Sequence, residues 1–324
     1  MRDRAWAFQE WLLSSRIAHF SRGELLWECK THQRCECQTI CFMHWKYDHH
    51  QEIKLVSSDN YGTIEGQQKP FNWNRVVEEF TRRRLTYPED ALPALSGLAE
   101  ILRIRTGQDY IGGLWKESLP DALLWIPERT FPGRMVGTKR RDSYYSPCWS
   151  WASVVGDHSI HFEVIHPQVQ YVAEIIRVSW EPVNASNPFG PLLSGHVKLK
   201  GLLATLPKKL LNCKLKAEVS AFIAIGRYPL RYNLSLDITA PAFEITSMNG
   251  VVVFIINITG SMGHGALKGL CLKRAKNACC FERIGIMSLL CDRHYNKDND
   301  KTGCPDLEKW TSMLKLKEGI VTII

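Results

Sequence analysis

The stretch that decides the fold is "SPCWSWASVVG", residues 146–156, in which Trp149 and Trp151 stand one residue apart among mostly small side chains. The pattern predicts a loop that leads into an aromatic strand. A buried tryptophan stabilises a fold by about 3 kcal/mol or more relative to alanine. Because the character of the sequence changes near this stretch, we expect both indoles to pack the junction between two halves of the chain.

The apolar residues that precede this stretch recur mainly at helical spacing. One apolar stripe follows residues 71–87 and a second follows residues 88–102. Further helical patterns occupy residues 4–13 and 110–125, whereas the sequence from Val164 onward is strand-like. The sequence therefore predicts an α+β fold, with a helix-rich N-terminal half followed by a β-rich, sandwich-like or barrel-like C-terminal half.

The same patterns divide the chain into four segments. Residues 1–28 are expected to form a helix followed by a hairpin, and residues 29–70 an irregular insertion rich in cysteine and histidine. Residues 71–145 form the helical region. Residues 146–324 form the β-rich C-terminal domain, which includes a hairpin that turns at Lys276–Asn277.

The composition is that of a soluble globular protein. Of 324 residues, 45% are hydrophobic and 23% are charged, and the formal net charge is +8. The basic residues are spread along the chain, with short clusters at 82–84 and 139–141, and this distribution does not favour nucleic-acid binding. The longest apolar run, Val251–Ile256, is too short to span a bilayer. Eleven cysteines, an odd number, without a signal peptide indicate a cytoplasmic protein with free thiols.

Gln9 occupies an unexpected place in the first helix. At 100° per residue it falls within the apolar face that includes Trp6, Phe8 and Leu13. A buried amide without hydrogen-bond partners costs about 1–3 kcal/mol, so Gln9 requires partners. Either Gln9 and Glu10 contact a partner or ligand, or the amide pins the helix to the backbone of a neighbouring strand.

Cysteines and histidines crowd the irregular insertion. Zinc takes four such ligands, usually from pairs spaced C-x₂₋₄-C and H-x₃₋₅-H. The candidate ligands are Cys29, Cys35, Cys37, Cys41 and His44, and of these Cys37 and Cys41 have a suitable spacing. A metal-binding or nucleic-acid-binding module is therefore one alternative. The preferred interpretation is an insertion with free thiols, with Cys29 buried in a strand and no metal assigned.

Cys148 lies next to the tryptophans and is the candidate nucleophile of this stretch. A reactive thiol needs a neighbouring base and an exposed, electropositive setting, whereas two tryptophans indicate apolar surroundings. Gly112–Gly113 lacks the spacing of a phosphate-binding loop, and the chain has no H-E-x-x-H, G-x-S-x-G or EF-hand motif. The sequence therefore predicts no catalytic residue and no cofactor.

Several stretches, in the same order, resemble the motifs of the fungal heterokaryon-incompatibility (HET) domain family. They cover most of residues 2–290 and include the tryptophan stretch quoted above. The others are "RAWAFQEWLLSSRIAHF" (4–20), "GELLWEC" (23–29), "VVEEFTRRRLTYPEDALPALSGLAE" (76–100), "YIGGLWKESLPDALLW" (110–125), "NPFGPLLSGHVKLKGLL" (187–203) and "FERIGI" (281–286).

The chain also departs from that family. There the element that resembles residues 4–10 closes the HET domain, so the resemblance implies that residues 1–28 are the C-terminal remnant of a HET domain without its N-terminal part. The preceding "Y-x-a-L-S-Y-x-W-G" strand does not occur here. This implies a truncated member, a short paralogue or a gene model that lost its 5′ exons. Trp11 stands where the family often has arginine, and Cys148 stands where it has serine.

The resemblance implies a non-enzymatic role in fungal nonself recognition, in which association with another protein triggers incompatibility cell death. A full-length family member is one candidate partner. We expect the helix face formed by Trp6, Phe8, Gln9 and Leu13 to be partly exposed and to contact that partner. One alternative is a TIR-like enzyme that cleaves NAD, which requires a complete HET domain upstream, and another is a non-functional truncated fragment. The family-motif and interface residues are Arg4, Trp6, Gln9, Glu10, Trp27, Arg84, Leu85, Trp115, Trp149 and Trp151.

Overall fold

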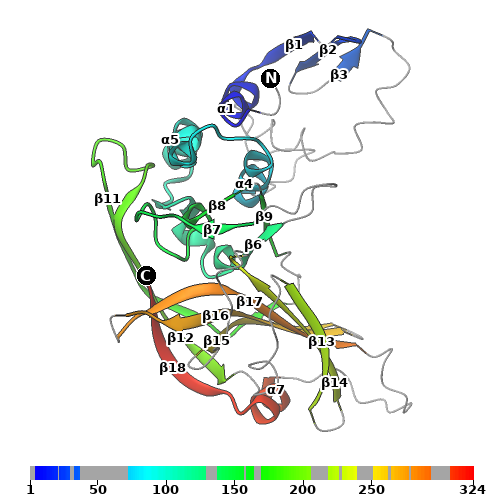
Figure 1. The fold of residues 1–324 in the computed structure, drawn as a ribbon, viewed down its shortest axis with the longest axis vertical. Helices are drawn as coiled ribbons and strands as arrows, with labels where there is room; N and C mark the ends of the chain where they lie inside the picture. The colour runs from blue at the N-terminus through cyan, green and yellow to red at the C-terminus, as the bar shows by residue number, and fades with distance from the viewer. Residues whose placement is uncertain are drawn as a thin grey trace.

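The computed structural model describes residues 4–20, 22–29, 33–36, 72–128, 137–156, 158–163, 169–205, 218–225, 228–238, 251–261, 264–276, 279–292 and 307–324. The molecule is elongated, with α1 and β1–β3 at one end and α7 at the other (Figure 1). In chain order the elements are α1 (Trp6–Leu13), β1 (Arg16–Phe20), β2 (Leu25–Cys29), β3 (Gln33–Cys35), α4 (Trp73–Thr81), η1 (Pro88–Asp90), α5 (Pro93–Thr106), β4 (Tyr110–Ile111), β5 (Leu114–Trp115), η2 (Lys116–Ser118), η3 (Asp121–Leu123), β6 (Trp125–Glu128), β7 (Lys139–Arg140), η4 (Trp151–Ser153), β8 (Val154–Val155), β9 (Ser159–Phe162), β10 (Val169–Tyr171), β11 (Glu174–Pro182), β12 (Leu192–Thr205), β13 (Glu218–Ile225), β14 (Tyr228–Leu236), β15 (Val252–Ser261), β16 (His264–Arg274), β17 (Phe281–Asp292), α7 (Leu307–Leu314) and β18 (Lys317–Ile323).

Strands, rather than helices, make up most of the described structure. The first half contains the helices α1, α4 and α5, but also the strands β1 to β9. The expected α+β fold with a helix-rich N-terminal half is therefore wrong. Residues 110–125 account for part of the error, because they form a hairpin, two 3₁₀ turns and the start of β6 instead of a helix. Most apolar side chains of this segment are buried whichever way they point, so their spacing does not report a helical period.

The hairpin β4–β5 depends on two glycines. Gly112 and Gly113 turn the chain with φ angles of +52° and +96°, which residues with a Cβ rarely adopt. The turn allows Tyr110 to pair with Trp115. A Cβ on Gly113 would also lie 2.5 Å from Nε1 of Trp151. Both the backbone conformation and the available space therefore require glycine at position 113.

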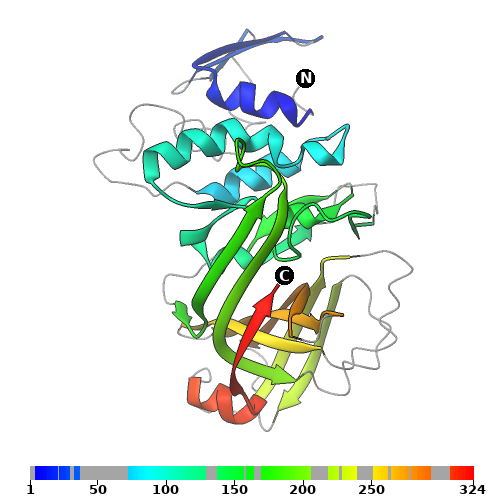
Figure 2. The same ribbon diagram turned by 90° about the vertical axis from the view of Figure 1, so that its left-hand side faces the viewer.

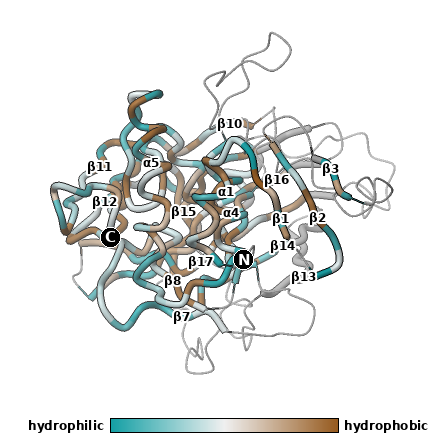
Figure 3. Tube along the Cα trace, turned by 90° about the horizontal axis from the view of Figure 1, so that it is seen from above, coloured by the Kyte–Doolittle hydropathy of each residue, from teal (hydrophilic) through white to brown (hydrophobic). Residues whose placement is uncertain are grey.

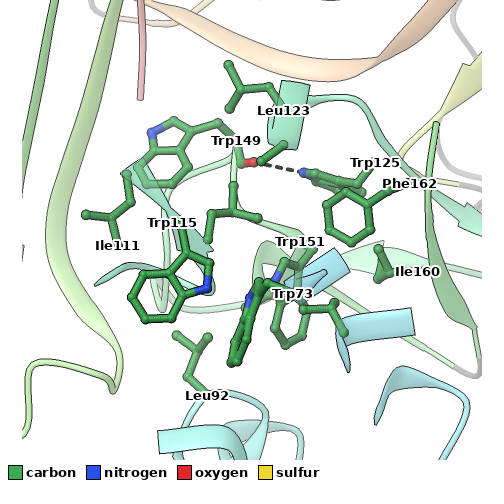
Figure 4. Packing of buried hydrophobic residues seen from close by; sticks show 14 of the residues in the cluster. Trp73, Leu92, Ile111, Trp115, Leu123, Trp125, Trp149, Trp151, Ile160 and Phe162 are labelled. Carbon is green, nitrogen blue, oxygen red and sulfur yellow. Dashed lines mark hydrogen bonds between the residues drawn. The ribbon is translucent and has the colours of Figure 1, made fainter. Parts of the chain in front are cut away.

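The carbonyl oxygen of Gly113 is the hub of a tryptophan cluster. It accepts hydrogen bonds from Nε1 of Trp73 (2.8 Å) and Nε1 of Trp151 (2.9 Å). A second backbone bond joins Nε1 of Trp125 to the carbonyl oxygen of Trp149 at 2.8 Å (Figure 4). Buried indole N–H groups need acceptors, and here backbone carbonyls from distant segments supply them. The bonds therefore fix α4, the β4–β5 turn and η4 relative to one another.

Side chains of α4 supply acceptors to one edge of β9. The other edge of β9 pairs with β6. The N–H of Ile160 donates to Oγ1 of Thr81 (2.8 Å), and the N–H of Phe162 donates to Oε1 of Glu78 (2.9 Å). Nδ1 of His161 lies 3.1 Å from the same Glu78 oxygen. The helix thus takes the place of a neighbouring strand and protects the edge.

The second half is built on a nine-stranded sheet in which five strands pair in a ring. β12 pairs with β15 and β18, β17 pairs with β16 and β18, and β16 pairs with β15. β11 extends this sheet beside β12, and the two strands rise together along the first half of the chain (Figure 2). The two halves therefore form one continuous packed unit.

The two faces of this sheet are buried in different apolar clusters. Phe254, Leu270 and Ile286 join the core of the first half. Val253, on the opposite face of β15, belongs to a second cluster with Trp310 of α7. Neighbouring residues on one strand point to opposite faces. These strands are consequently apolar on both sides.

A buried arginine joins the sheet to the first half. The Cζ atom of Arg283 lies 3.5 Å from the ring centroid of Trp125, and its Nη2 donates to the Trp125 carbonyl oxygen and to Oδ1 of Asp237. Asp237 also accepts a hydrogen bond from Nη2 of Arg140 at 2.8 Å. Burial lowers the pKa of Arg283 to about 10, although Asp237 opposes this effect. Arg283 therefore stays charged at neutral pH and pairs with a carboxylate.

Replacing Gly113 by alanine tests the hub. Backbone strain of about 1–2 kcal/mol adds to the displacement of the Trp151 indole, so we expect Gly113→Ala to lower the free energy of unfolding by about 3 kcal/mol or more. Gly107 is the matched control, because its φ is also positive (+70°) but no atom lies within 4 Å of an added Cβ. Gly107→Ala should cost about 1 kcal/mol. Equal losses in urea unfolding would contradict the role of the hub.

The His161–Glu78 contact predicts a dependence of stability on pH. The hydrogen bond with Glu78 raises the pKa of His161, against the opposing effect of burial. The stabilisation is fully present below the unfolded-state pKa and is lost as the pH rises through the folded-state pKa. Because the side chain is 37% exposed, we expect less than about 1 kcal/mol. Urea unfolding of the wild type and of His161→Gln should show a difference that shrinks with rising pH, and a constant difference would contradict the assignment.

Candidate interaction surface

The end of the molecule is formed by α1 and the antiparallel sheet β1–β2–β3. Phe20 pairs with Leu25 and Ala18 with Trp27, and Trp27 pairs in turn with Arg34 of β3. Seen from above, β3 lies at the rim of the molecule, outside the stack of α1, α4 and α5 (Figure 3). Successive residues of each strand point in turn toward α1 and toward the solvent.

Two motif segments that are distant in sequence attach this end to the rest of the fold. Arg4 and Arg84 form a parallel β-bridge, and the N–H of Ala5 donates to the Arg84 carbonyl oxygen at 3.0 Å. Leu85 is half-buried against the main core. These three sequence candidates, Arg4, Arg84 and Leu85, hold the surface in place through backbone bonds and packing.

Gln9 packs directly on the backbone of α5. A Cβ on Gly97 would lie 2.3 Å from Nε2 of Gln9, so the amide occupies the space that the glycine leaves open. Phe8 and Leu12 beside it are fully buried. The neighbouring element is therefore a helix, whereas the structural interpretation of Gln9 expected a strand.

The face of the first helix that was expected to be partly exposed is exposed mainly at Trp6. Trp6 is 45% exposed, but Phe8 is fully buried and Gln9 and Leu13 are half-buried. Nε1 of Trp6 donates to Oδ2 of Asp90 at 2.8 Å. The helix face is therefore directed mainly at α5, because α1 and α5 pack together. Glu10, the carboxylate of the motif, is exposed on α1.

A buried carboxylate joins the three-stranded sheet to α1. Glu28 on β2 is fully buried and accepts a hydrogen bond from Nε1 of Trp11. Nε2 of His19 lies 3.3 Å from Oε2 of Glu28. The guanidinium of Arg83 lies 5.6 Å from the Trp11 ring centroid. Glu28 and Arg83 were not candidates from sequence, although the alternation along β2 places Glu28 on the helix side.

The solvent side of the sheet gathers large apolar side chains. Phe20 is 86% exposed, Trp27 is 37% exposed and Leu25 is 36% exposed. By alternation Arg34 of β3 lies on the same side and is exposed. Glu36 follows the last residue of β3, and its Oε2 accepts a hydrogen bond from the N–H of Leu25 at 3.4 Å. Aromatic residues and arginine with adjacent charges are typical of protein-binding surfaces. Trp27 was a sequence candidate, whereas Phe20 and Leu25 emerge from the pairing of the strands.

The candidate metal ligands do not form a common site within the described residues. Cys35 pairs with Leu26, which faces α1, whereas Cys29 lies on the side of Trp27. The register therefore directs these two cysteines to opposite faces of the sheet. In the part of the chain that the structure describes, no group of three or more His, Cys, Asp or Glu residues is placed to hold a metal. The remaining candidates, Cys37, Cys41 and His44, lie outside the described residues.

The other motif tryptophans lie in the core. Trp115 and Trp151 are 3% exposed and Trp149 is fully buried. Nε1 of Trp149 donates to the carbonyl oxygen of Gly195 on β12 at 3.4 Å. The Trp115 ring meets the Trp73 ring edge-on, with centroids 5.6 Å apart. These residues determine the fold that supports the surface and do not themselves form part of it.

Cys148 has the surroundings of a packing residue. Its Sγ accepts a hydrogen bond from the N–H of Arg283 at 2.9 Å. Burial raises the pKa of the Cys148 thiol to about 11, although Arg140 opposes this effect. The thiol is therefore protonated at neutral pH, whereas a nucleophile requires the thiolate.

Comparisons of the chain with known protein families, with curated proteins and with solved structures find no match. Among the helices of the described residues, none combines the length and the apolar character that crossing a membrane requires.

The bond between Trp11 and Glu28 can be tested by substitution. Trp11→Phe keeps an aromatic ring but removes the N–H that the buried carboxylate accepts, so we expect a loss of about 1–3 kcal/mol in the free energy of unfolding. Trp11→Arg restores a donor and should cost less. A double-mutant cycle with Glu28→Gln isolates the coupling, and zero coupling energy would show that the bond does not hold the sheet to α1.

Proposed function

We propose that this chain is a heterokaryon-incompatibility-type protein that acts in the cytoplasm in fungal nonself recognition. It associates with another protein, for which a full-length family member is one candidate, and this association leads to incompatibility cell death. The contact surface is the solvent side of the three-stranded sheet. We name it the outer face and define it by Ala18, Phe20, Leu25, Trp27 and Arg34.

The composition of the outer face is the observation that carries this proposal. Phe20, Leu25 and Trp27 together expose a continuous apolar strip across two strands. Exposed apolar groups of this kind mark contact sites with other proteins. The strip belongs to the sheet that lies at one end of the molecule (Figure 1).

The connections among the motif segments give further support. The segments that resemble the HET family bond to one another, through Arg4 and Arg84, through Trp151 and Gly113, and through Arg283 and Trp125. Each contact joins residues that are far apart in sequence. Because the motif segments contact one another, they are expected to occur together in proteins that share this fold.

Controlled expression in a filamentous fungus tests the proposed function. Wild-type protein should increase the fraction of dead cells counted with a vital dye. Trp27→Glu places a charge in the centre of the outer face and should reduce that fraction to the level of the empty vector. It leaves the buried core unchanged, because Trp27 is already 37% exposed.

Ile320→Glu is the matched control, since Ile320 is an exposed apolar residue (56%) on a strand of the other sheet. It should kill cells as the wild type does, at equal protein levels in immunoblots. Absence of death with the wild type, or equal death with Trp27→Glu, would contradict the proposal.

A further inference from the structure

Two adjacent cysteines lie at the end of the hairpin that β16 and β17 form. Arg274 and Phe281 are the pair nearest the turn, and the N–H of Ala275 donates to the Cys280 carbonyl oxygen at 3.0 Å. Cys280 therefore stands at the base of the turn, and Cys279 precedes it within the turn. The paired strands and this hydrogen bond fix the backbone that carries the two thiols.

The accessibility of these thiols differs from that of other cysteines. Among the cysteines whose side chains the structure describes, Cys279 is the one that is exposed, and Cys280 is half-buried. Burial raises the pKa of Cys148 to about 11 and the pKa of Cys271 to about 12. Those two thiols stay protonated at neutral pH, whereas the thiolate is the reactive form. An oxidant in the solvent therefore reacts with Cys279 before it reacts with them.

The charge of the turn is mainly positive. The segment from residue 273 to residue 282 contains three basic residues and one acidic residue. One of the basic residues, Arg274, places its Cζ 5.3 Å from the ring centroid of Phe281, the residue that follows Cys280. Reactive cysteines typically occupy partly exposed, electropositive surroundings, and the turn has both properties.

The adjacency of the two cysteines determines what kind of bond they can form. Consecutive Cα atoms are about 3.8 Å apart across a trans peptide bond, whereas the Cα atoms of disulfide-bonded cysteines are usually about 4.4–6.8 Å apart. A disulfide between neighbouring residues is therefore strained, and strained or exposed disulfides are the ones that are reduced most readily. The pair is consequently suited to a reversible modification and not to a permanent cross-link.

We propose that Cys279 and Cys280 form a site of reversible oxidation, at which hydrogen peroxide converts the two thiols into one disulfide. The Cys279 sulfur attacks one peroxide oxygen, the O–O bond breaks, and the thiol proton leaves with the other oxygen as water. The Cys280 sulfur then attacks the resulting sulfenic acid, the S–S bond forms, and the hydroxyl group leaves with the Cys280 proton as a second water. Overall the two thiols lose two electrons, which reduce one hydrogen peroxide to two waters.

The site is separate from the outer face. β16 and β17 belong to the nine-stranded sheet, whereas the outer face belongs to the three-stranded sheet. Oxidation at the turn can therefore be tested independently of the proposed function.

Peptide mapping of the full chain tests the site. Trypsin cleaves after Lys276 and Arg283, so residues 277–283 leave as one peptide that contains both cysteines and no other. The reduced chain is treated with increasing doses of hydrogen peroxide, labelled with N-ethylmaleimide under denaturing conditions and digested. We expect this peptide to become lighter by two hydrogen atoms and to carry no label, at doses that leave Cys148 and Cys271 labelled. Dithiothreitol should restore the reduced peptide.

Serine variants separate the roles of the two thiols. In Cys280→Ser the sulfenic acid at Cys279 has no neighbouring thiol to react with, so we expect loss of the disulfide and a stable adduct with dimedone. Cys279→Ser also loses the disulfide and should form less adduct at the same dose, because Cys280 is less exposed. Cys148→Ser is the matched control and should form the disulfide as the wild type does.

Three results would overturn the proposal. The first is a 277–283 peptide that is oxidised no earlier than Cys148 and Cys271. The second is a disulfide that joins Cys279 or Cys280 to a different peptide. The third is oxidation of either residue to sulfinic acid without a disulfide in the wild type.

Discussion

The carbonyl oxygen of Gly113 is the point on which the first half of the molecule depends. It accepts the indole N–H groups of Trp73 and Trp151, which come from α4 and η4. Only a residue without a Cβ fits there, because the backbone has a positive φ and the Trp151 ring leaves no room. Through Trp149, the same cluster reaches the Gly195 carbonyl on β12 and so contacts the large sheet. The position of α1, and with it the three-stranded sheet, follows from this core.

Local patterns in the sequence predicted those elements that have one buried side and one exposed side. The hairpin β1–β2 was expected from its apolar runs and turn, and the structure has it. Residues 110–125 were mistaken for a helix because burial on all sides conceals the period. The partner of Gln9 was unpredictable for another reason, since Gly97 lies far along the chain and marks its role only by lacking a side chain. The burial of Phe8 likewise depends on a contact between α1 and α5 that no local pattern encodes.

The outer face was only partly accessible from sequence. Trp27 was a candidate from its motif, but its exposure depends on which side of the sheet α1 covers. That choice is made by Glu28, whose buried carboxylate meets Trp11 and His19. Since successive residues on a strand alternate, directing Glu28 toward the helix directs Trp27 toward solvent. With Glu28 directed toward the helix, Phe20, Leu25 and Trp27 are left on the solvent side of the sheet.

Site-specific photo-crosslinking in living fungal cells tests most directly whether the outer face is where this protein meets its partner. A photoreactive phenylalanine analogue replaces Trp27 in one variant and Ile320 in another, since both side chains are exposed on strands. The account predicts a discrete protein adduct at position 27, visible as a band of higher mass, and none at position 320. Adducts at position 320 but not at position 27 would contradict it.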